Sequence, residues 1–118
     1  MLIKVLRSKI HRATVTEAEL EYVGSITIDK ELMDAVGIVP GEEVLVADLD
    51  NGSRLVTYVL EGQPGSGTIC LNGAAARLVH VGDKVIIMSF AYLTPEDASR
   101  YDPSVILVDD KNRISQRL

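Results

Sequence analysis

An internal repeat constrains the fold of this chain more than any other feature of its sequence. When the sequence is shifted by 41 positions, residues 25–46 align without a gap on residues 66–87. Six of the 22 aligned pairs are identical, among them Gly41 with Gly82 and Val44 with Val85. Each copy reads as a strand, a short helix, a glycine-acid turn and a second strand. The repeat therefore predicts a small barrel of two related halves, a form that leaves no exposed strand edges.

Length and composition are those of one soluble globular domain with an aliphatic interior. The chain has 118 residues, of which 47% are hydrophobic and only 4% are aromatic. Val, Ile and Leu must therefore build the core. Cys70 is the only cysteine, so an internal disulfide is excluded. His11 and His80 lack ligand-like spacing, and we therefore predict no metal site.

Charge and hydropathy patterning argue against two classes of partner. The net charge is −5, whereas nucleic-acid binding needs Lys and Arg to neutralise phosphates. The longest mainly apolar stretch, residues 85–93, is too short to span a membrane. Basic residues interrupt the apolar ones near the N-terminus, which breaks any signal-peptide core. We expect a cytoplasmic protein that binds neither nucleic acid nor membrane.

Strand signals dominate the chain, so we predict a mainly β fold with a few short helices. The β-rich runs are Lys4–Thr16, Glu43–Asp48, Arg54–Leu60, Val85–Phe90 and Val105–Val108. Asn51-Gly52 predicts a tight hairpin turn. The helices are expected at 30–36, between the cap Asp29 and Gly37, from Asn72 through Ala76, and after Thr94-Pro95.

The dipeptide Gly-Ser occurs three times, and one copy has unusual surroundings. Gly52-Ser53 and Gly65-Ser66 are explained as loops. Gly24-Ser25 lies between Tyr22-Val23 and residues 26–28, where a continuous strand is expected. Glycine inside a strand pattern indicates an unusual backbone or a close approach by another group. Taken alone, the dipeptide favours a β-bulge.

Eight short motifs, in their order and spacing, resemble the aspartate 1-decarboxylase family along nearly the whole chain. They are Lys9-Ile10-His11-Arg12, Tyr22-Val23-Gly24-Ser25, Ile28-Asp29, Asp50-Asn51-Gly52, Thr57-Tyr58, Gly65-Ser66, Asn72-Gly73-Ala74-Ala75-Ala76 and Tyr101-Asp102-Pro103. The resemblance implies a double-psi β-barrel in a single domain, and a homotetramer with active sites between subunits. Two positions depart from the family pattern, Pro64 and Arg77.

The resemblance also implies that the chain cuts its own backbone between Gly24 and Ser25. The products would be a short β chain (1–24) and a longer α chain (25–118). A serine hydroxyl held against the preceding carbonyl can convert that amide into an ester, and glycine at position 24 leaves the carbonyl open to attack. Elimination and hydrolysis then release ammonia and leave a covalent pyruvoyl group at residue 25.

That group would serve as the cofactor for decarboxylating L-aspartate to β-alanine, which feeds pantothenate and coenzyme A synthesis. The substrate amine forms a Schiff base with the ketone, and the adjacent carbonyl accepts the electrons released as carbon dioxide leaves. By resemblance, Tyr58 is the proton donor, and Thr57 assists processing and contacts substrate. In an ideal strand these two side chains point to opposite faces. For both to act in one site, either the strand must be kinked or the site must approach its backbone from two sides. The sequence does not decide between autonomous cleavage and a maturation factor.

Several residues are candidates for holding the substrate. Arg54 shares strand parity with Tyr58 and can clamp the retained carboxylate, although an Arg beside a hairpin is also typical of a solvated edge. Lys9 is the second cationic candidate. Asn72 begins a loop-to-helix segment whose free amides can bind an anion, and the family places substrate at Gly73, Ala74 and Ala75. His11 falls on the same alternating strand face as Lys9, and a hydrogen-bonded core histidine is the equal alternative.

Three alternatives remain open from the sequence. The first is a non-enzymatic barrel in which Ser25 stays intact. The second is a small swapped-hairpin barrel that regulates transcription, which the acidic charge disfavours. The third is a pyruvoyl decarboxylase that acts on another amino acid.

Overall fold

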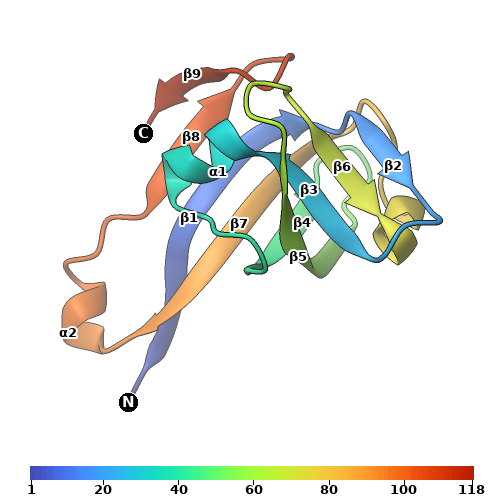
Figure 1. Cartoon of the computed structure of the whole chain (residues 1–118). Coiled ribbons are helices and arrows are strands. Elements are labelled where there is room, and N and C mark those ends of the chain that lie inside the picture. Colours follow the sequence, from blue (N-terminus) through green and yellow to red (C-terminus); the bar gives the residue numbers. More distant parts are fainter.

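Strands make up most of the molecule, and the helices are short (Figure 1). The computed structural model describes all residues, 1–118. In chain order the elements are β1 (Ile3–Thr14), β2 (Glu17–Glu19), β3 (Ser25–Asp29), α1 (Lys30–Val36), β4 (Glu43–Asp48), β5 (Arg54–Gly62), β6 (Ile69–Asn72), η1 (Gly73–Arg77), β7 (Lys84–Leu93), α2 (Pro95–Ala98), β8 (Ser104–Val108) and β9 (Ile114–Arg117). The predicted mainly β fold with a few short helices is confirmed.

Hydrogen bonding closes the strands into a ring. The order β6-β3-β5-β4-β7-β1 forms a continuous sheet. The chain that leaves β1 continues through β2, which pairs in parallel with β6. At the junction, the Thr16 N–H donates to the Ile69 carbonyl at 2.8 Å. The strands therefore form a closed double-psi β-barrel, as predicted, with no free edge in the ring.

The strand register reveals the relation between the two halves. Val46 pairs with Ile87 where β4 meets β7, and Ile28 pairs with Ile69 where β3 meets β6. In both pairs the partners are 41 positions apart, so each residue lies opposite its own equivalent in the repeat. A pseudo-twofold axis must therefore pass through both pairs. The internal repeat in the sequence corresponds to the symmetry of the barrel.

The two glycine-acid turns obey the same symmetry. The N–H of Gly41 donates to the Val59 carbonyl at 2.7 Å, and the N–H of Gly82 donates to the Val15 carbonyl at 2.8 Å. Both glycines have positive φ, 85° and 95°, a conformation that favours glycine. Val15 in the chain after β1 is therefore the counterpart of Val59 in β5, which explains why β1 and β5 occupy equivalent places in the ring.

Aliphatic side chains fill the barrel, as the composition predicts. Alternate residues of the strands point inward, and a cluster of 19 buried residues forms one core. It includes Ile10, Ile26, Ile28, Val44, Val46, Val59, Ile69, Leu71, Val85, Ile87 and Ile106. Helix α1 closes one opening through Leu32, Met33 and Val36, all of which are buried. Asp29 caps this helix, and Gly37 ends it with φ 77°, as predicted.

The structure differs from the predicted elements in three places. The predicted first strand ends at Thr14, and within it the pairing with β7 shifts register between Ile10 and Ala13, where Arg12 has φ 67°. Asn51-Gly52 lies in a five-residue loop between β4 and β5, because the Asp48 carboxylate caps the turn through the backbone amides of residues 50 and 51. Strands β2 and β9 were not predicted, since β2 has only three residues and all residues of β9 are exposed.

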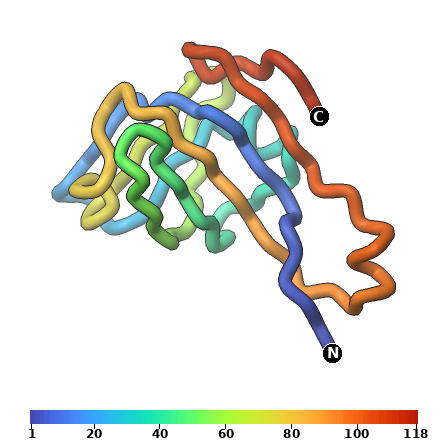
Figure 2. The backbone as a smooth tube through the Cα atoms, turned by 180° about the vertical axis from the view of Figure 1, so that it is seen from behind, coloured from blue at the N-terminus to red at the C-terminus, as the bar shows by residue number.

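Strands β1 and β7 run side by side beyond the barrel as a two-stranded arm toward the N-terminus (Figures 1 and 2). Helix α2 lies near the far end of this arm, and the chain returns along β1 as strand β8. The hydroxyl of Tyr101 donates to the Arg7 carbonyl at 3.3 Å and fixes the return. No helix is long and apolar enough to cross a membrane.

Candidate active site

Ser25 is the first residue of β3 and is fully buried. Tyr22, Val23 and Gly24 lie in the turn before it, so the dipeptide marks the start of a strand and not a bulge within one. The Ser25 hydroxyl donates to the Val23 carbonyl at 3.0 Å. The hydroxyl is therefore held beside the peptide bond that joins residues 24 and 25.

Asn72 fixes the hydroxyl of Ser25 from the neighbouring strand. Ser25 pairs with Asn72 in the antiparallel β3–β6 ladder. The Asn72 side chain is 3% exposed, and its Nδ2 donates to Ser25 Oγ at 2.9 Å and to Thr27 Oγ1 at 3.2 Å. Asn72 was expected to begin a helix and contact substrate. It precedes a short 3-10 helix without capping it, because its amide is turned toward the serine.

Cys70 orients the amide of Asn72. The Cys70 thiol donates to Asn72 Oδ1 at 3.2 Å, which directs Nδ2 toward Ser25. Burial raises the pKa of the Cys70 thiol, and the nearby carboxylates of Glu17 and Glu19 raise it further. The thiol therefore stays protonated and remains a donor at neutral pH. Sequence reasoning missed this role, because a lone cysteine on a strand carries no signal of its partner.

Gly73 brings the next segment directly against Gly24. A Cβ on Gly73 would lie 2.7 Å from the Gly24 Cα and 2.8 Å from the Gly24 nitrogen, and Gly73 has φ 66°. Only glycine permits this approach and this backbone conformation. At Gly24 itself an added Cβ would meet nothing within 4 Å. The steric need for glycine in the intact chain therefore lies at Gly73.

A pocket of about 260 Å³ opens beside the Gly24 peptide. Its lining combines four of the predicted site residues, Gly24, Thr57, Ala74 and Ala75, with three apolar neighbours, Leu55, Val56 and Leu78. The small side chains of η1 leave this space open. The volume suits a small ligand, since pockets for drug-sized molecules begin at roughly 300 Å³. A second hollow of about 480 Å³ beside Lys4 and Phe90 includes none of the predicted site residues.

Three predicted residues, Arg54, Tyr58 and Lys9, are not among the residues that line this pocket. Arg54 and Tyr58 are exposed residues of β5, whereas Thr57 between them lines the pocket. Residues 54–58 pair with β4 without a register shift. No kink therefore turns Tyr58 inward, and of the two arrangements that the sequence left open, approach from two sides remains. Lys9 is half-buried on β1, which pairs with β7 and β8.

His11 is not a hydrogen-bonded core histidine, one of the two interpretations left open by the sequence. The residue is half-buried, and its Nδ1 is buried without a hydrogen-bond partner. Burial lowers the pKa of His11, and the charges of Lys9 and Arg12 lower it further. The imidazole is therefore neutral at pH 7. Pro64 and Arg77, the two departures from the family pattern, are both exposed.

The fold and the pocket define a class: a double-psi β-barrel with a candidate site around a buried serine at the start of a strand. The chain belongs to the aspartate decarboxylase family, whose sequence model, described as "Aspartate decarboxylase", matches residues 1–115. It is 64% identical over 114 residues to the aspartate 1-decarboxylase of Caldicellulosiruptor saccharolyticus, covering 97% of this chain and 89% of that one. It is 59% identical to the aspartate 1-decarboxylase of Lactiplantibacillus plantarum over 118 residues, covering 100% and 91%.

These similarities confirm the resemblance predicted from the sequence and the assignment to the decarboxylases, which are lyases. The two non-enzymatic alternatives are therefore set aside. A solved structure, the computationally designed msDPBB_sym2 protein, is 25% identical, with a TM-score of 0.49, over 74% of this chain and 99% of that chain.

Proposed function

We propose that this chain cleaves itself between Gly24 and Ser25 and then decarboxylates L-aspartate to β-alanine. The observation that carries the proposal is the Asn72 amide, which donates to Ser25 Oγ at 2.9 Å beside the peptide to be cut. Cleavage yields the chains 1–24 and 25–118. Membership of the aspartate decarboxylase family supports the substrate.

The residues around Ser25 suit cleavage from within the chain. Ser25 Oγ attacks the Gly24 carbonyl and replaces the amide by an ester, and the hydrogen bonds from Asn72 and to the Val23 carbonyl fix Oγ at the turn that contains Gly24. Such positioning raises the rate of cleavage, because the reacting groups are already oriented and need not meet by chance. The exposed Gly24 backbone gives water access for the hydrolysis that follows. Thr57 lies in the adjoining pocket and assists this processing.

The same surroundings fit a pyruvoyl group at residue 25. Position 25 is buried and flanked by the polar groups of Asn72 and Thr27, and the adjoining pocket has space for a small amino acid. The pyruvoyl group supplies a carbonyl that condenses with the substrate amine and an electron sink for decarboxylation. Gly73, Ala74 and Ala75 border the substrate through their backbone and small side chains.

The remaining residues come from a neighbouring subunit of a homotetramer. Tyr58 and Arg54 face outward from the barrel while Thr57 lines the pocket of the same chain. An outward tyrosine can donate a proton to the former α-carbon only in a site that a second chain completes. Arg54 and Lys9 then hold the retained carboxylate, Arg54 through two parallel hydrogen bonds. The product feeds pantothenate and coenzyme A synthesis in the cytoplasm.

An activity assay tests the substrate. Purified protein should release carbon dioxide and β-alanine from L-aspartate, and Ser25→Ala should abolish both. Glutamate serves as the competing substrate, because one further methylene changes the fit by only about 1–3 kcal/mol. Turnover of glutamate at a rate equal to or above that of aspartate would contradict the assignment. Incubating unprocessed protein with and without cell extract shows whether a maturation factor is needed.

Substitutions of the outward-facing residues Tyr58 and Arg54 should impair turnover of aspartate without impairing cleavage of the chain. Tyr58→Phe and Arg54→Ala should leave the chain fully cleaved but lower kcat/KM for aspartate by about 100-fold or more, since each removes a group that acts only on the substrate. Tyr92→Phe and Arg100→Ala are matched controls, because both residues are exposed and neither lines the pocket beside Gly24. Unchanged kinetics in Tyr58→Phe would remove this tyrosine from the mechanism.

A further inference from the structure

Three carboxylates from two segments of the chain meet beside the β4–β5 loop. Asp48 ends β4, Asp50 lies in the following loop, and Asp83 directly precedes β7. One oxygen from each lies within 4.8 Å of the others. A single hard cation at about 2.3–2.6 Å from each oxygen would hold its ligands within about 5 Å of one another. The spacing of the three oxygens is therefore that of a cation site.

Asp48 provides an independent sign that a ligand is missing from this cluster. The residue is 3% exposed. Its Oδ1 accepts hydrogen bonds from the Asp50 N–H at 2.8 Å and the Asn51 N–H at 3.2 Å. Its Oδ2 is buried and has no hydrogen-bond partner. A buried carboxylate oxygen without a partner is costly, so a positive charge or a proton is required next to it.

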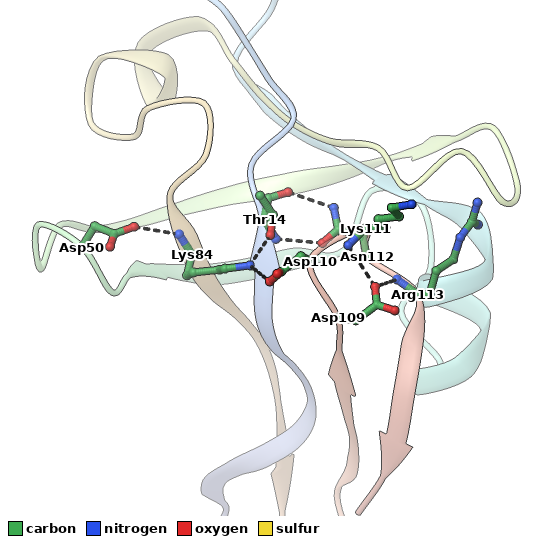
Figure 3. A network of polar contacts seen from close by, with 8 residues as sticks. All are labelled: Thr14, Asp50, Lys84, Asp109, Asp110, Lys111, Asn112 and Arg113. Carbon is green, nitrogen blue, oxygen red and sulfur yellow. Dashed lines mark hydrogen bonds and ion pairs between the residues drawn. The ribbon is translucent and has the colours of Figure 1, made fainter.

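The chain supplies no cationic side chain for this purpose. No lysine or arginine forms an ion pair with the three carboxylates. Lys84 is adjacent in sequence, but its Nζ is directed away, to Thr14 Oγ1 at 2.6 Å and Asp110 Oδ1 at 2.7 Å (Figure 3). Only the backbone N–H of Lys84 reaches Asp50, at 2.9 Å. His80 Nδ1 lies 3.7 Å from Asp83 Oδ2, and its side chain is exposed.

The geometry points to a binding site for a hard divalent cation, of the Ca²⁺ or Mg²⁺ class, formed by the carboxylates of Asp48, Asp50 and Asp83. Oxygen-only ligands select such ions over transition metals. Oxygens within 4.8 Å of one another fit the bond lengths of Ca²⁺, which are longer and less strict in geometry than those of Mg²⁺. No metal site was predicted from the sequence, because only cysteine and histidine were considered as ligands. The three aspartates come together only in the folded chain.

A bound ion would brace the border of the candidate active site. It would link the β4–β5 loop to the turn before β7. In the same loop Asn51 Nδ2 donates to the Leu78 carbonyl at 2.8 Å, and Leu78 lines the pocket beside Gly24. The ion is therefore structural, and its binding is independent of the proposed reaction.

Calorimetric titration and thermal unfolding of the full-length, chelator-treated protein test the site. CaCl₂ should bind saturably with one ion per chain and more tightly than MgCl₂, and NaCl at equal ionic strength should not bind. At ten times Kd the ion should raise Tm by about 5 °C. Decarboxylation is not part of the readout, so failure of the proposed reaction would leave this result unaffected.

Asp50→Asn and Asp83→Asn should each weaken binding at least tenfold, because each retains the shape of the site and removes one charge. Asp102→Asn is the matched control, since Asp102 is exposed and outside the cluster; it should bind as the wild type does. No saturable binding of either divalent ion to the wild type would overturn the site and leave a shared proton between Asp48 and Asp83. Wild-type affinity in both cluster variants would overturn it equally.

Discussion

The two halves of the barrel each carry a Gly-Ser pair at the equivalent position of the repeat, yet the two serines have different surroundings. Ser25 is fully buried, and its hydroxyl is fixed by the Asn72 amide. Its equivalent, Ser66, is exposed, and its hydroxyl only accepts from the Thr68 N–H at 3.2 Å within its own turn. Symmetry of the backbone thus does not extend to chemistry. The neighbours of the hydroxyl decide which serine can react.

The residues that follow the two serines show how the difference arises. Asp29 and Cys70 are equivalent in the repeat. The Asp29 carboxylate accepts from the amides of Gly65 and Gly67 and holds the second Gly-Ser turn as a rigid loop. Cys70 instead contacts the side chain of Asn72, which reaches Ser25. One half uses this position to stabilise a loop, and the other uses it to orient a donor at the candidate site.

Replacing each serine by alanine should give the largest difference between the two halves. Ser25→Ala should abolish cleavage, because no hydroxyl would remain at position 25 to attack the Gly24 carbonyl. Ser66→Ala should cleave fully and lose less than about 1 kcal/mol of unfolding free energy, since it gives up one exposed hydrogen bond. Denaturing gel electrophoresis and urea unfolding measure the two effects. Cleavage at Gly24 in Ser25→Ala would break the comparison.

Glycine replacements test the close approach to the cleavage site. Gly73→Ala and Gly65→Ala both place a Cβ at positive φ, 66° and 77°, which costs about 1–2 kcal/mol. Only at Gly73 would the Cβ collide with Gly24. We expect cleavage to slow by about 100-fold in Gly73→Ala, because displacing reacting groups by about 1 Å has effects of this size. Gly65→Ala should cleave at close to the wild-type rate; equal rates in both variants would contradict the role of Gly73.

Substitutions of two buried asparagines distinguish the positioning of the Ser25 hydroxyl from the stability of the fold. Asn72→Ala should slow cleavage by about tenfold, since the lost hydrogen bonds to Ser25 and Thr27 are together worth about 1–3 kcal/mol. Asn112 is also buried and bonds the backbone of Thr14 and Gly67. Asn112→Ala should lower the unfolding free energy at least as much and leave the cleavage rate unchanged. A time course of fragment appearance, alongside urea unfolding, distinguishes these outcomes.

Cys70 should give the smallest effect. Cys70→Val removes the donor to Asn72 Oδ1 while keeping similar volume, and it should slow cleavage by about threefold, because a thiol is a weak donor. Cys70→Ser restores a donor and should cleave at the wild-type rate or faster. Identical rates in the valine and serine variants would show that packing alone matters at this position.

The sequence predicts the fold well because the repeat and the alternation of apolar residues both report on the core. The shift of 41 positions also predicts the strand register, because the repeat and the pairing of Val46 with Ile87 reflect the same symmetry. The hairpin loop after β4 was predicted too short, because a side chain of Asp48 reorganises the turn. Local propensity does not include such a contact.

The candidate site could be predicted only in part, and the reason is physical. Residues 24, 57, 74 and 75 are far apart in the sequence, and their convergence on one pocket was available only through the family resemblance. The Asn72–Ser25 hydrogen bond and the Cys70 thiol behind it depend on side-chain orientation across two strands. The outward direction of Tyr58 follows from strand parity, but the subunit contact that it requires is not encoded in any single-chain pattern.

Mass spectrometry of freshly purified wild-type protein under denaturing conditions tests the central claim most directly. We predict a fragment of residues 1–24 and a fragment of residues 25–118 that is lighter by one ammonia than a chain starting with serine. Full-length chains with intact serine at position 25, in a preparation that decarboxylates aspartate at full rate, would contradict the account.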